Sequence, residues 1–351
     1  MPDARTSLFR IAFSALDHFG ANKALAKHAR GLGVILTLHH VRPFSGGAFA
    51  PNRHLEIEPT FLDLALTRAR NAGFDFVTLD EALSRVRAGV SPRPFLHLTF
   101  DDGYRDVRDH ALPILRRHGA PATLYIASDF ADGHARLWWL ELEAGLARAD
   151  RVEVDLGDGR KSVSCRTVDE KANAFKTILR ALRQGPEERL RAETLKIAEA
   201  GGVDASAFAR DLCMRWDELA EVGADPLVEI GAHTVSHPML ATHPPETARA
   251  EMAGSWQAIA ERLGAAPAHF AYPVGDLAAA GDREYALAAE LGFASAVTTR
   301  PGHLTQAHAQ TPTALPRVSL NGHFQTRAAV DAYLSGAPFA LMAAAKRVLG
   351  R

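Results

Sequence analysis

The sequence predicts an α/β fold built on a parallel sheet, and two observations support this prediction. Short apolar runs alternate with segments of helical periodicity along most of the chain, which is the pattern of repeated βαβ units. The chain has 351 residues, of which 47% are hydrophobic, and this is enough to bury a full core. We therefore expect one main domain with insertions.

The expected elements follow one another from residue 33 onward. Each strand is a short apolar run, and each helix repeats apolar residues every three to four positions, as before Gly73 and Gly119. The expected strands span residues 33–39, 95–100, 122–127, 227–230, 269–272, 294–298 and 315–318. The expected helices span residues 59–72, 106–117, 246–263 and 284–291.

The alternation breaks down between residues 127 and 227. A crossover between two parallel strands needs about a dozen residues, and this connection is far longer. It contains a Trp138-Trp139 pair, a strand-like run at 152–154, a turn at 157–159 and helical patterns at 169–183 and 186–200. We interpret residues from about 134 to 225 as an inserted subdomain, which either serves packing or dimer contact or forms a wall over a substrate groove.

Both ends of the chain are amphipathic, and we divide them from the main domain as helical segments 1–32 and 326–351. Apolar residues at helical spacing include Leu8 and Ile11 in the first segment and Phe339 and Leu341 in the last. We favour packing of both segments on the main domain. The alternative is attachment to a membrane surface, which basic amphipathic helices also support.

Composition and charge limit the possible binding partners and the cellular compartment. A balance of 40 basic against 41 acidic residues gives no bulk electrostatic reason to bind nucleic acid. Residues 1–33 carry scattered charges and lack the apolar core of a secretory signal, and no later window is long enough to span a membrane. We therefore expect a cytoplasmic protein. Cys165 and Cys213 are isolated and show no ligand spacing, so a disulfide framework is not expected.

The most informative motif is T-F-D-D-G at residues 99–103, which places two adjacent carboxylates at the end of an apolar run. Asp101 and Asp102 can supply a general base and a metal ligand, and Gly103 allows the sharp turn through which both face one site. A turn or helix-capping cluster would explain the two carboxylates equally well if they stood alone.

The second motif, H-T-V-S-H-P at residues 233–238, follows another apolar run. Its histidines, His233 and His237, are four positions apart, and Gly231 and Pro238 favour a loop at a strand end over a helix. Two histidines and one carboxylate leave positions open for water and substrate, as in catalytic metal centres. Hydrolysis is the chemistry that this set predicts first. A non-haem iron oxygenase is the alternative, and the strand and helix alternation argues against it.

Together the two motifs resemble those of the polysaccharide deacetylases that share the NodB homology domain, the family 4 carbohydrate esterases. The resemblance covers roughly residues 33–325 and implies a distorted (β/α) barrel of seven or eight strands. It implies that Asp101 is the general base and that Asp102, His233 and His237 bind a divalent metal, usually zinc. Such an ion lowers the pKa of water to about 7 and polarises the acetyl carbonyl.

The third motif departs from that family. Many relatives read F-R-x-P-Y-G, whereas residues 270–275 read F-A-Y-P-V-G and resemble the poly-N-acetylglucosamine deacetylase branch. The arginine that would hold the catalytic base is therefore absent at Ala271. The resemblance assigns Tyr272, Pro273 and Val274 to substrate and oxyanion contacts, with the backbone N–H of Val274 as the oxyanion donor.

The last family motif is a strand ending in Leu-x-His, and its histidine is absent here because residues 315–320 read L-P-R-V-S-L. We expect His39, at the end of the first strand, to be the general acid, with His323 as the alternative and His40 pointing the other way. Arg317 is the best-placed replacement for the missing arginine and is expected to hold Asp101. The alternative for Arg317 is a surface arginine after a proline turn.

We therefore predict a metal-dependent N-deacetylase that acts on an N-acetylhexosamine-containing glycan, oligosaccharide or lipid-linked sugar. The alternatives are a deformylase of a lipid-linked amino sugar and a carbohydrate-binding protein without catalysis, which the intact Asp101 disfavours. Trp138 and Trp139 then either stack on sugar rings or fill the core of the insertion. The sequence leaves the glycan, the physiological metal and the oligomeric state open.

Overall fold

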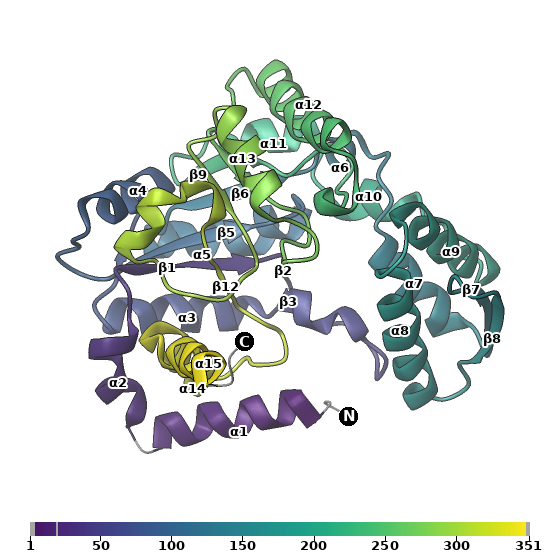
Figure 1. Ribbon diagram of the computed structural model, residues 1–351, viewed down its shortest axis with the longest axis horizontal. Helices are drawn as coiled ribbons and strands as arrows, with labels where there is room; N and C mark the ends of the chain where they lie inside the picture. The colour runs from purple at the N-terminus through teal and green to yellow at the C-terminus, as the bar shows by residue number, and fades with distance from the viewer. Residues whose placement is uncertain (1–3, 19, 349–351) are drawn as a thin grey trace.

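The computed structural model describes residues 4–18 and 20–348, and its centre is a curled parallel sheet (Figure 1). The strands lie in the order β11-β10-β9-β6-β5-β1-β12, and all their pairings are parallel. A short strand, β4 (Asp75–Phe76), pairs with the beginning of β5. The other bounds are β1 (Gly33–Leu38), β5 (Phe95–Phe100), β6 (Ala122–Ile126), β9 (Val228–Ala232), β10 (His269–Ala271), β11 (Ser295–Val297) and β12 (Val318–Ser319).

One short segment closes this sheet into a distorted barrel. Leu315 pairs with Val297 of β11, and Val318 of β12 pairs with Leu36 of β1, so a single stretch of chain bridges both edges. The strand predicted at 315–318 is interrupted at Pro316, which lies between the two pairings and has no N–H to donate to a ladder. The predicted α/β barrel is otherwise confirmed.

Helices cover the outside of the barrel (Figure 1). This cover is required because the strands are continuous apolar runs, and all residues of β1 and β5 are buried. The helices predicted at 59–72, 246–263 and 284–291 are confirmed, whereas the sequence did not predict α4 or α11. The bounds are α3 (Pro59–Asn71), α4 (Leu79–Ala88), α11 (Trp216–Gly223), α12 (Pro245–Leu263) and α13 (Asp282–Glu290).

The helix after the first motif differs from its prediction at its start. Residues 107–111 form a π-helical turn, η2 (Val107–Ala111), and only then does α5 (Leu112–His118) begin. Pro113 cannot donate a hydrogen bond to the carbonyl four residues earlier. The amide of Leu112 donates to the carbonyl of Val107, five residues back, and this widens the turn enough to admit the proline.

Between β6 and β9 the chain leaves the barrel and forms a helical subdomain, most of which stands to one side in Figure 1. Helices α7 and α9 pack so closely that a Cβ at Gly145 would lie 2.6 Å from the carbonyl oxygen of Ile197. The subdomain boundaries that we assigned from the sequence stay a prediction. Its elements are α6 (Ser128–Asp132), α7 (Trp138–Arg148), the antiparallel pair β7 (Arg151–Asp155) and β8 (Arg160–Ser164), α8 (Val168–Leu182), α9 (Glu187–Ala200) and α10 (Ala207–Leu212).

The terminal helices lie together on one side of the barrel (Figure 1). Phe13 of α1 packs edge-on against Phe324 and Tyr333, whereas Leu8 and Ile11 are 66% and 67% exposed. No described helix is both long and apolar enough to cross a membrane. Contact with a membrane surface stays a prediction. The bounds are α1 (Ala4–His18), α2 (Ala21–Ala29), α14 (Arg327–Ser335) and α15 (Ala337–Val348).

The loops between the barrel strands and helices contain several short elements. After β1 the chain forms β2 (His40–Val41), which pairs in parallel with β3 (Glu56–Ile57). The 3₁₀ helix η1 (Pro51–Leu55) precedes β3 and lies beside α7. Three further 3₁₀ turns are η3 (Leu240–Thr242), η4 (Gln306–Gln310) and η5 (Pro312–Ala314).

Candidate active site

The loop of the first motif follows β5 and brings two carboxylates to the carboxyl end of the barrel. Asp101 and Asp102 are only 2% and 3% exposed, and both line the same cavity. Asp102 has a φ of 72° and Gly103 a φ of 66°, so two successive residues adopt the left-handed region. This turn breaks the alternation of a strand, in which neighbouring side chains point to opposite faces, and both carboxylates can therefore share one site.

Asp102 faces two imidazoles. Its Oδ1 lies 3.5 Å from Nε2 of His233 and 3.4 Å from Nε2 of His237. Among the described residues, these three form the one compact group of side chains that could hold a metal ion. That Oδ1 is buried and has no hydrogen-bond partner among the described residues. An orphaned carboxylate oxygen beside two imidazole nitrogens fits a divalent cation.

A backbone carbonyl fixes the tautomer of His233. Its Nδ1 lies 2.7 Å from the carbonyl oxygen of Ala271, which can only accept, so Nδ1 carries the proton. When His233 is neutral, its lone pair therefore lies on Nε2, the atom that faces Asp102. This arrangement is the usual support for a metal-ligating histidine.

Backbone strain is concentrated around this group. Among the described residues, four that are not glycine have positive φ, and all four lie in the loops of the three motifs. A left-handed conformation costs roughly 1–2 kcal/mol for a residue with a Cβ, and it is least expected for a β-branched residue such as Val274. Strain of this kind clusters at functional sites. The four are Asp102 (φ 72°), Thr234 (69°), His237 (60°) and Val274 (61°).

Arg317 and Asp101 form a buried bidentate ion pair. The guanidinium Nη1 lies 2.7 Å from Oδ1, and Nη2 lies 2.7 Å from Oδ2. Arg317 also donates to Thr99 Oγ1 and to the carbonyl of Thr298, each at 2.9 Å. The contact expected from the sequence is therefore present, and the alternative of a surface arginine is wrong because the side chain is fully buried. A charge so deeply buried requires this degree of pairing.

Burial and neighbouring charges shift the pKa values of the two carboxyl groups in opposite directions. Burial alone raises the pKa of Asp101, but the Arg317 guanidinium outweighs it and holds that pKa below its ordinary value. Burial is likewise outweighed at Asp102, whose pKa the two imidazoles lower. Burial lowers the pKa of His237 to about 3. Both carboxylates are therefore ionised and His237 is neutral at pH 7, as metal ligation requires.

A cavity of about 340 Å³ opens over these groups. Val274 lines it, and no described residue accepts a hydrogen bond from the Val274 amide. The barrel contributes Thr37, His39, Asp101, Asp102, His233, His237, Val274, Asp276, Thr299 and Ser319.

Tyr272 and Pro273 do not line this cavity, which corrects the expectation of a substrate or oxyanion contact. The ring of Tyr272 is buried against Phe270 and Tyr285, and its hydroxyl donates to the carbonyl of Thr313 at 2.8 Å. Strand β10 ends at Ala271, and the next side chain packs into the layer between the barrel and α13. Of this motif, only Val274 reaches the cavity.

Of the three histidines considered for the general acid, His39 alone lines the cavity. It is half-buried and follows directly after β1. His40 points away, as predicted: its Nδ1 lies 2.6 Å from Asp106 Oδ2, and its ring stacks on Tyr104. His323 lies in the loop before α14 and is not a lining residue.

His54 is a cavity residue that the sequence did not reveal. It belongs to η1, its Nδ1 lies 3.2 Å from the carbonyl of Pro51, and burial lowers its pKa to about 4. Neither a motif nor a periodic pattern marks this position. Its ring centroid lies 6.2 Å from that of His323, so the two histidines are neighbours although only His54 reaches the cavity.

The histidine loop is held from outside by residues that the motifs do not contain. Glu251 of α12 accepts hydrogen bonds from the amides of Val235 and Ser236 and from the Ser236 hydroxyl, all within 2.9 Å. Arg191 of α9 donates to the carbonyls of Ser236 and His237, at 3.1 Å each. These five contacts offset the strain of the loop. Because Arg191 comes from the subdomain, that subdomain helps to hold the loop of His233 and His237.

The subdomain also forms one wall of the cavity. Trp138 and Trp139 are buried lining residues, and the ring of Trp139 packs against His237 with centroids 5.1 Å apart. Leu179 and Arg183, at the C-terminal end of α8, also line the cavity. Arg183 forms an ion pair with Asp276 of the barrel at 2.8 Å. The tryptophans therefore serve both the packing and the cavity surface.

Comparison with known protein families finds one family whose sequence model includes the residues of this site. The sequence model described as "Polysaccharide deacetylase" matches residues 88–296, which is more than half of the chain. The match contains Asp101, Asp102, His233 and His237, whereas Arg317 lies outside it. No curated protein matches the chain.

Solved structures share the fold at low sequence identity. The deacetylase PplD of Streptococcus pyogenes, in complex with acetate, has a TM-score of 0.53 at 18% identity, with 83% of this chain and 92% of that chain covered. IcaB from Ammonifex degensii has a TM-score of 0.54 at 20% identity, with 88% and 97% covered. A polysaccharide deacetylase from Bacillus cereus has a TM-score of 0.52 at 16% identity, with 86% and 68% covered.

Proposed function

We propose, from the premise that this chain belongs to the polysaccharide deacetylase family, that it removes acetyl groups from an N-acetylhexosamine-containing glycan with the help of a divalent ion. Family membership makes it a hydrolytic deacetylase of glycans. The observation that carries the metal dependence is the buried group of Asp102, His233 and His237 beside the ion pair of Asp101 and Arg317.

Asp102, His233 and His237 would hold the ion through Oδ1 and the two Nε2 atoms. Two imidazoles and a carboxylate suit zinc, which is the metal that we expect. When bound, the ion supplies a Lewis acid that lowers the pKa of water and polarises a carbonyl. The neutral His237 and the ionised Asp102 are ready for this role without a change of protonation.

Asp101 is proposed as the general base. It is ionised and oriented because Arg317 binds both of its oxygens. It lines the same cavity as Asp102, so it can take a proton from water that attacks an acetyl carbon there. Val274 lies in the loop after β10 and lines the cavity, and its backbone amide is proposed to donate a hydrogen bond to the oxyanion that develops.

His39 is proposed as the general acid that protonates the leaving amine. It faces the cavity from the end of β1, a position across the barrel from the histidine loop. Burial lowers the pKa of His39, so its neutral form predominates at pH 7, and it takes up a proton during the reaction before it donates one to the leaving amine. The resemblance of residues 270–275 to the poly-N-acetylglucosamine deacetylase branch supports a glycan with β-linked N-acetylglucosamine, free or lipid-linked, as the substrate class.

Acetate release from chitooligosaccharides and from poly-N-acetylglucosamine tests this function. We expect turnover that a chelator abolishes and added zinc restores, and none with the Asp101→Asn variant. An N-formyl substrate of the same length, assayed in parallel, separates deacetylation from deformylation. Turnover that survives complete removal of metal, with metal content measured in the same sample, would contradict the proposed metal dependence.

A further inference from the structure

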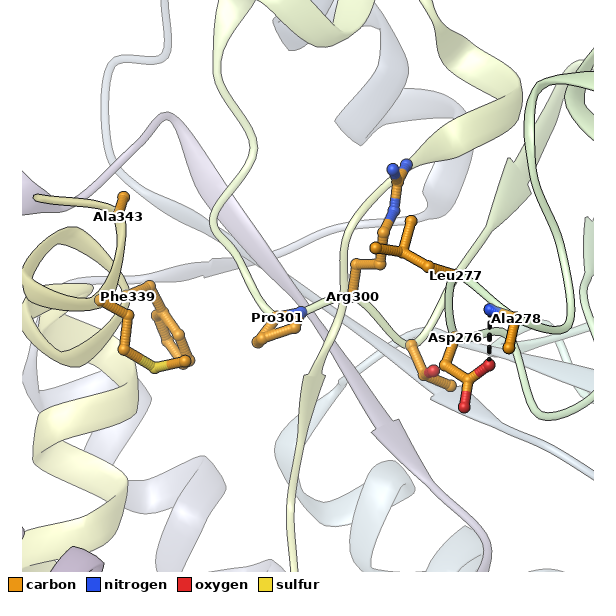
Figure 2. Close-up of a pocket in the computed structure, with 9 residues that line it drawn as sticks. Asp276, Leu277, Ala278, Arg300, Pro301, Phe339 and Ala343 are labelled. Carbon is orange, nitrogen blue, oxygen red and sulfur yellow. Dashed lines mark hydrogen bonds between the residues drawn. The ribbon is translucent and has the colours of Figure 1, made fainter. Parts of the chain in front are cut away.

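A second cavity adjoins the active site. It has a volume of about 510 Å³ and lies between the loop after β10, the loop after β11 and the C-terminal helix α15. Figure 2 shows Phe339 and Ala343 on one side of it, Asp276, Leu277 and Ala278 on the other, and Arg300 and Pro301 between them. Two residues, Asp276 and Thr299, line both this groove and the active-site cavity, so the two spaces are neighbours.

The groove presents an unusual amount of exposed apolar side chain. Among the described residues, eight large hydrophobic side chains are exposed, and Leu277 and Met342 of the groove are two of them, at 72% and 36%. Leu341, the neighbour of Met342 in the sequence, is a third, at 51%, but it does not line the groove. Phe339, Met342 and Ala343 share one face of α15 because they lie three and four positions apart. Exposed apolar surface gathered in one groove marks an interaction site.

Polar contacts lie between the groove and the active-site cavity. Arg183 of the subdomain reaches Asp276 at 2.8 Å, and the Thr299 hydroxyl donates to the carbonyl of Val274 at 2.8 Å. The same Val274 is the residue proposed to stabilise the oxyanion. Because Asp276 and Thr299 line both spaces, a substrate that extends from the active-site cavity past these two residues would reach the apolar groove.

We propose that this groove binds the apolar aglycone of a glycolipid substrate while its N-acetylhexosamine occupies the active site. This inference rests on the proposed function and names its substrate class more closely. A further stretch of glycan would need hydrogen-bond partners for its hydroxyl groups, whereas most of the groove is formed by Leu277, Ala278, Pro301, Phe339, Met342 and Ala343. An alkyl chain matches such a surface, and each methylene that it buries favours binding.

The test compares two soluble substrates that differ only in the aglycone, the methyl and octyl β-glycosides of N,N′-diacetylchitobiose, below the micelle-forming concentration of the latter. We expect kcat/KM for the octyl glycoside to exceed that for the methyl glycoside at least about tenfold, since several methylenes are buried. Leu277→Ser and Met342→Ser should bring this ratio close to one, mainly through KM for the octyl glycoside. Both side chains are exposed, so neither change threatens the fold.

Val90→Ser is the matched control, because Val90 is 68% exposed and precedes β5 at the opposite end of the barrel. It should leave the ratio unchanged. A ratio near one in the unaltered protein, or a ratio that Leu277→Ser and Met342→Ser do not change, overturns the proposal. A dimer that Leu277→Ser dissociates in sedimentation experiments, with no change in the ratio, overturns it in favour of a second copy of this chain.

Calorimetry separates failure of the groove from failure of the proposed function. If neither glycoside releases acetate, the proposed function fails, and binding of the octyl glycoside decides the inference on its own. Binding that is at least about tenfold tighter than for the methyl glycoside, and that Leu277→Ser abolishes, supports the groove. Equal binding of both glycosides overturns it.

Discussion

The guanidinium of Arg317 binds both carboxylate oxygens of Asp101 at 2.7 Å, although the two residues are 216 positions apart in the sequence. Arg317 comes from the segment that closes the barrel, and Asp101 comes from the end of β5 on the other side of β1. Closure of the barrel and orientation of the proposed base therefore depend on the same short segment.

Arg317→Lys should lower kcat about 10- to 100-fold with little change in KM, because a misplaced base is costly and an ammonium cannot bind both oxygens at once. Bound metal and the circular dichroism spectrum should stay as in the unaltered protein, since a positive charge remains in the buried site. Steady-state kinetics and metal analysis of one preparation check this. Full activity in Arg317→Lys would show that bidentate orientation is not needed.

Asp102→Ala, His233→Ala and His237→Ala should each reduce bound metal well below one per chain while the protein stays folded, because the barrel core does not include the ion. Asp101→Asn should behave differently. It should retain the metal and lose activity by at least about 100-fold, as expected when a general base is removed. Elemental analysis together with acetate release separates the two roles, and metal loss in Asp101→Asn would move that residue into the ligand set.

His39→Gln should reduce turnover about 100-fold or more without metal loss, because a general acid contributes on this scale. His323→Gln should be near normal, since His323 does not line the cavity. His54→Gln is the more informative comparison, because His54, like His39, lines the cavity. A large loss in His54→Gln together with near-normal His39→Gln would transfer the proposed acid role to η1.

Arg191→Met should weaken metal binding about tenfold or more, because it removes two hydrogen bonds to the strained loop that holds His237. Arg180→Met on the neighbouring helix α8 is the control. Arg180 is exposed, and its substitution removes the same charge from the subdomain without touching the histidine loop. Metal titration of both variants against a chelating indicator measures the difference. Equal affinities would show that the Arg191 hydrogen bonds do not support the group of Asp102, His233 and His237.

Glu229→Gln should change how stability depends on pH. Burial raises the pKa of Glu229 from 4.5 to about 7, with Asp80 adding to the shift. A group whose pKa is raised on folding contributes stability that is present below pH 4.5 and is lost as pH rises through about 7. Because 35% of the side chain is exposed, we expect a modest effect. Glu229→Gln should raise Tm by roughly 1–3 °C at pH 8 and leave it unchanged at pH 4, as measured by calorimetry.

Much of the fold and the centre of the site can be read from local sequence. The apolar runs at 33–39, 95–100 and 122–127 became β1, β5 and β6, because a run buried on both faces has few other stable outcomes. Asp101 and Asp102 are adjacent in the sequence, and His233 and His237 lie in one loop. Each motif therefore carries its chemistry within a few residues, and both follow strands whose carboxyl ends meet at one edge of the barrel.

Other parts of the site depend on packing between distant segments. Glu251 and Arg191 hold the histidine loop, and His54 enters the cavity, yet no local pattern marks any of them. Tyr272 lies two positions before Val274, which lines the cavity, yet its ring packs in the core against Phe270 and Tyr285. Val274 has a positive φ, so the chain no longer follows strand geometry there, and the alternation of side chains along β10 does not predict which of the two enters the cavity. Such contacts follow from how whole elements are placed against one another.

The strained backbone shows most clearly which features local sequence determines and which depend on tertiary contacts. The amino acids at Thr234, His237 and Val274 favour extended or right-handed conformations, and each is held at positive φ by its surroundings. A propensity summed along the chain cannot predict such conformations, because the hydrogen bonds that outweigh their cost come from α9, α12 and the loop after β11. Local sequence was thus sufficient for the choice of chemical groups and of the barrel. The placement of those groups within one cavity follows from tertiary contacts, because only these supply enough free energy to hold a strained loop in place.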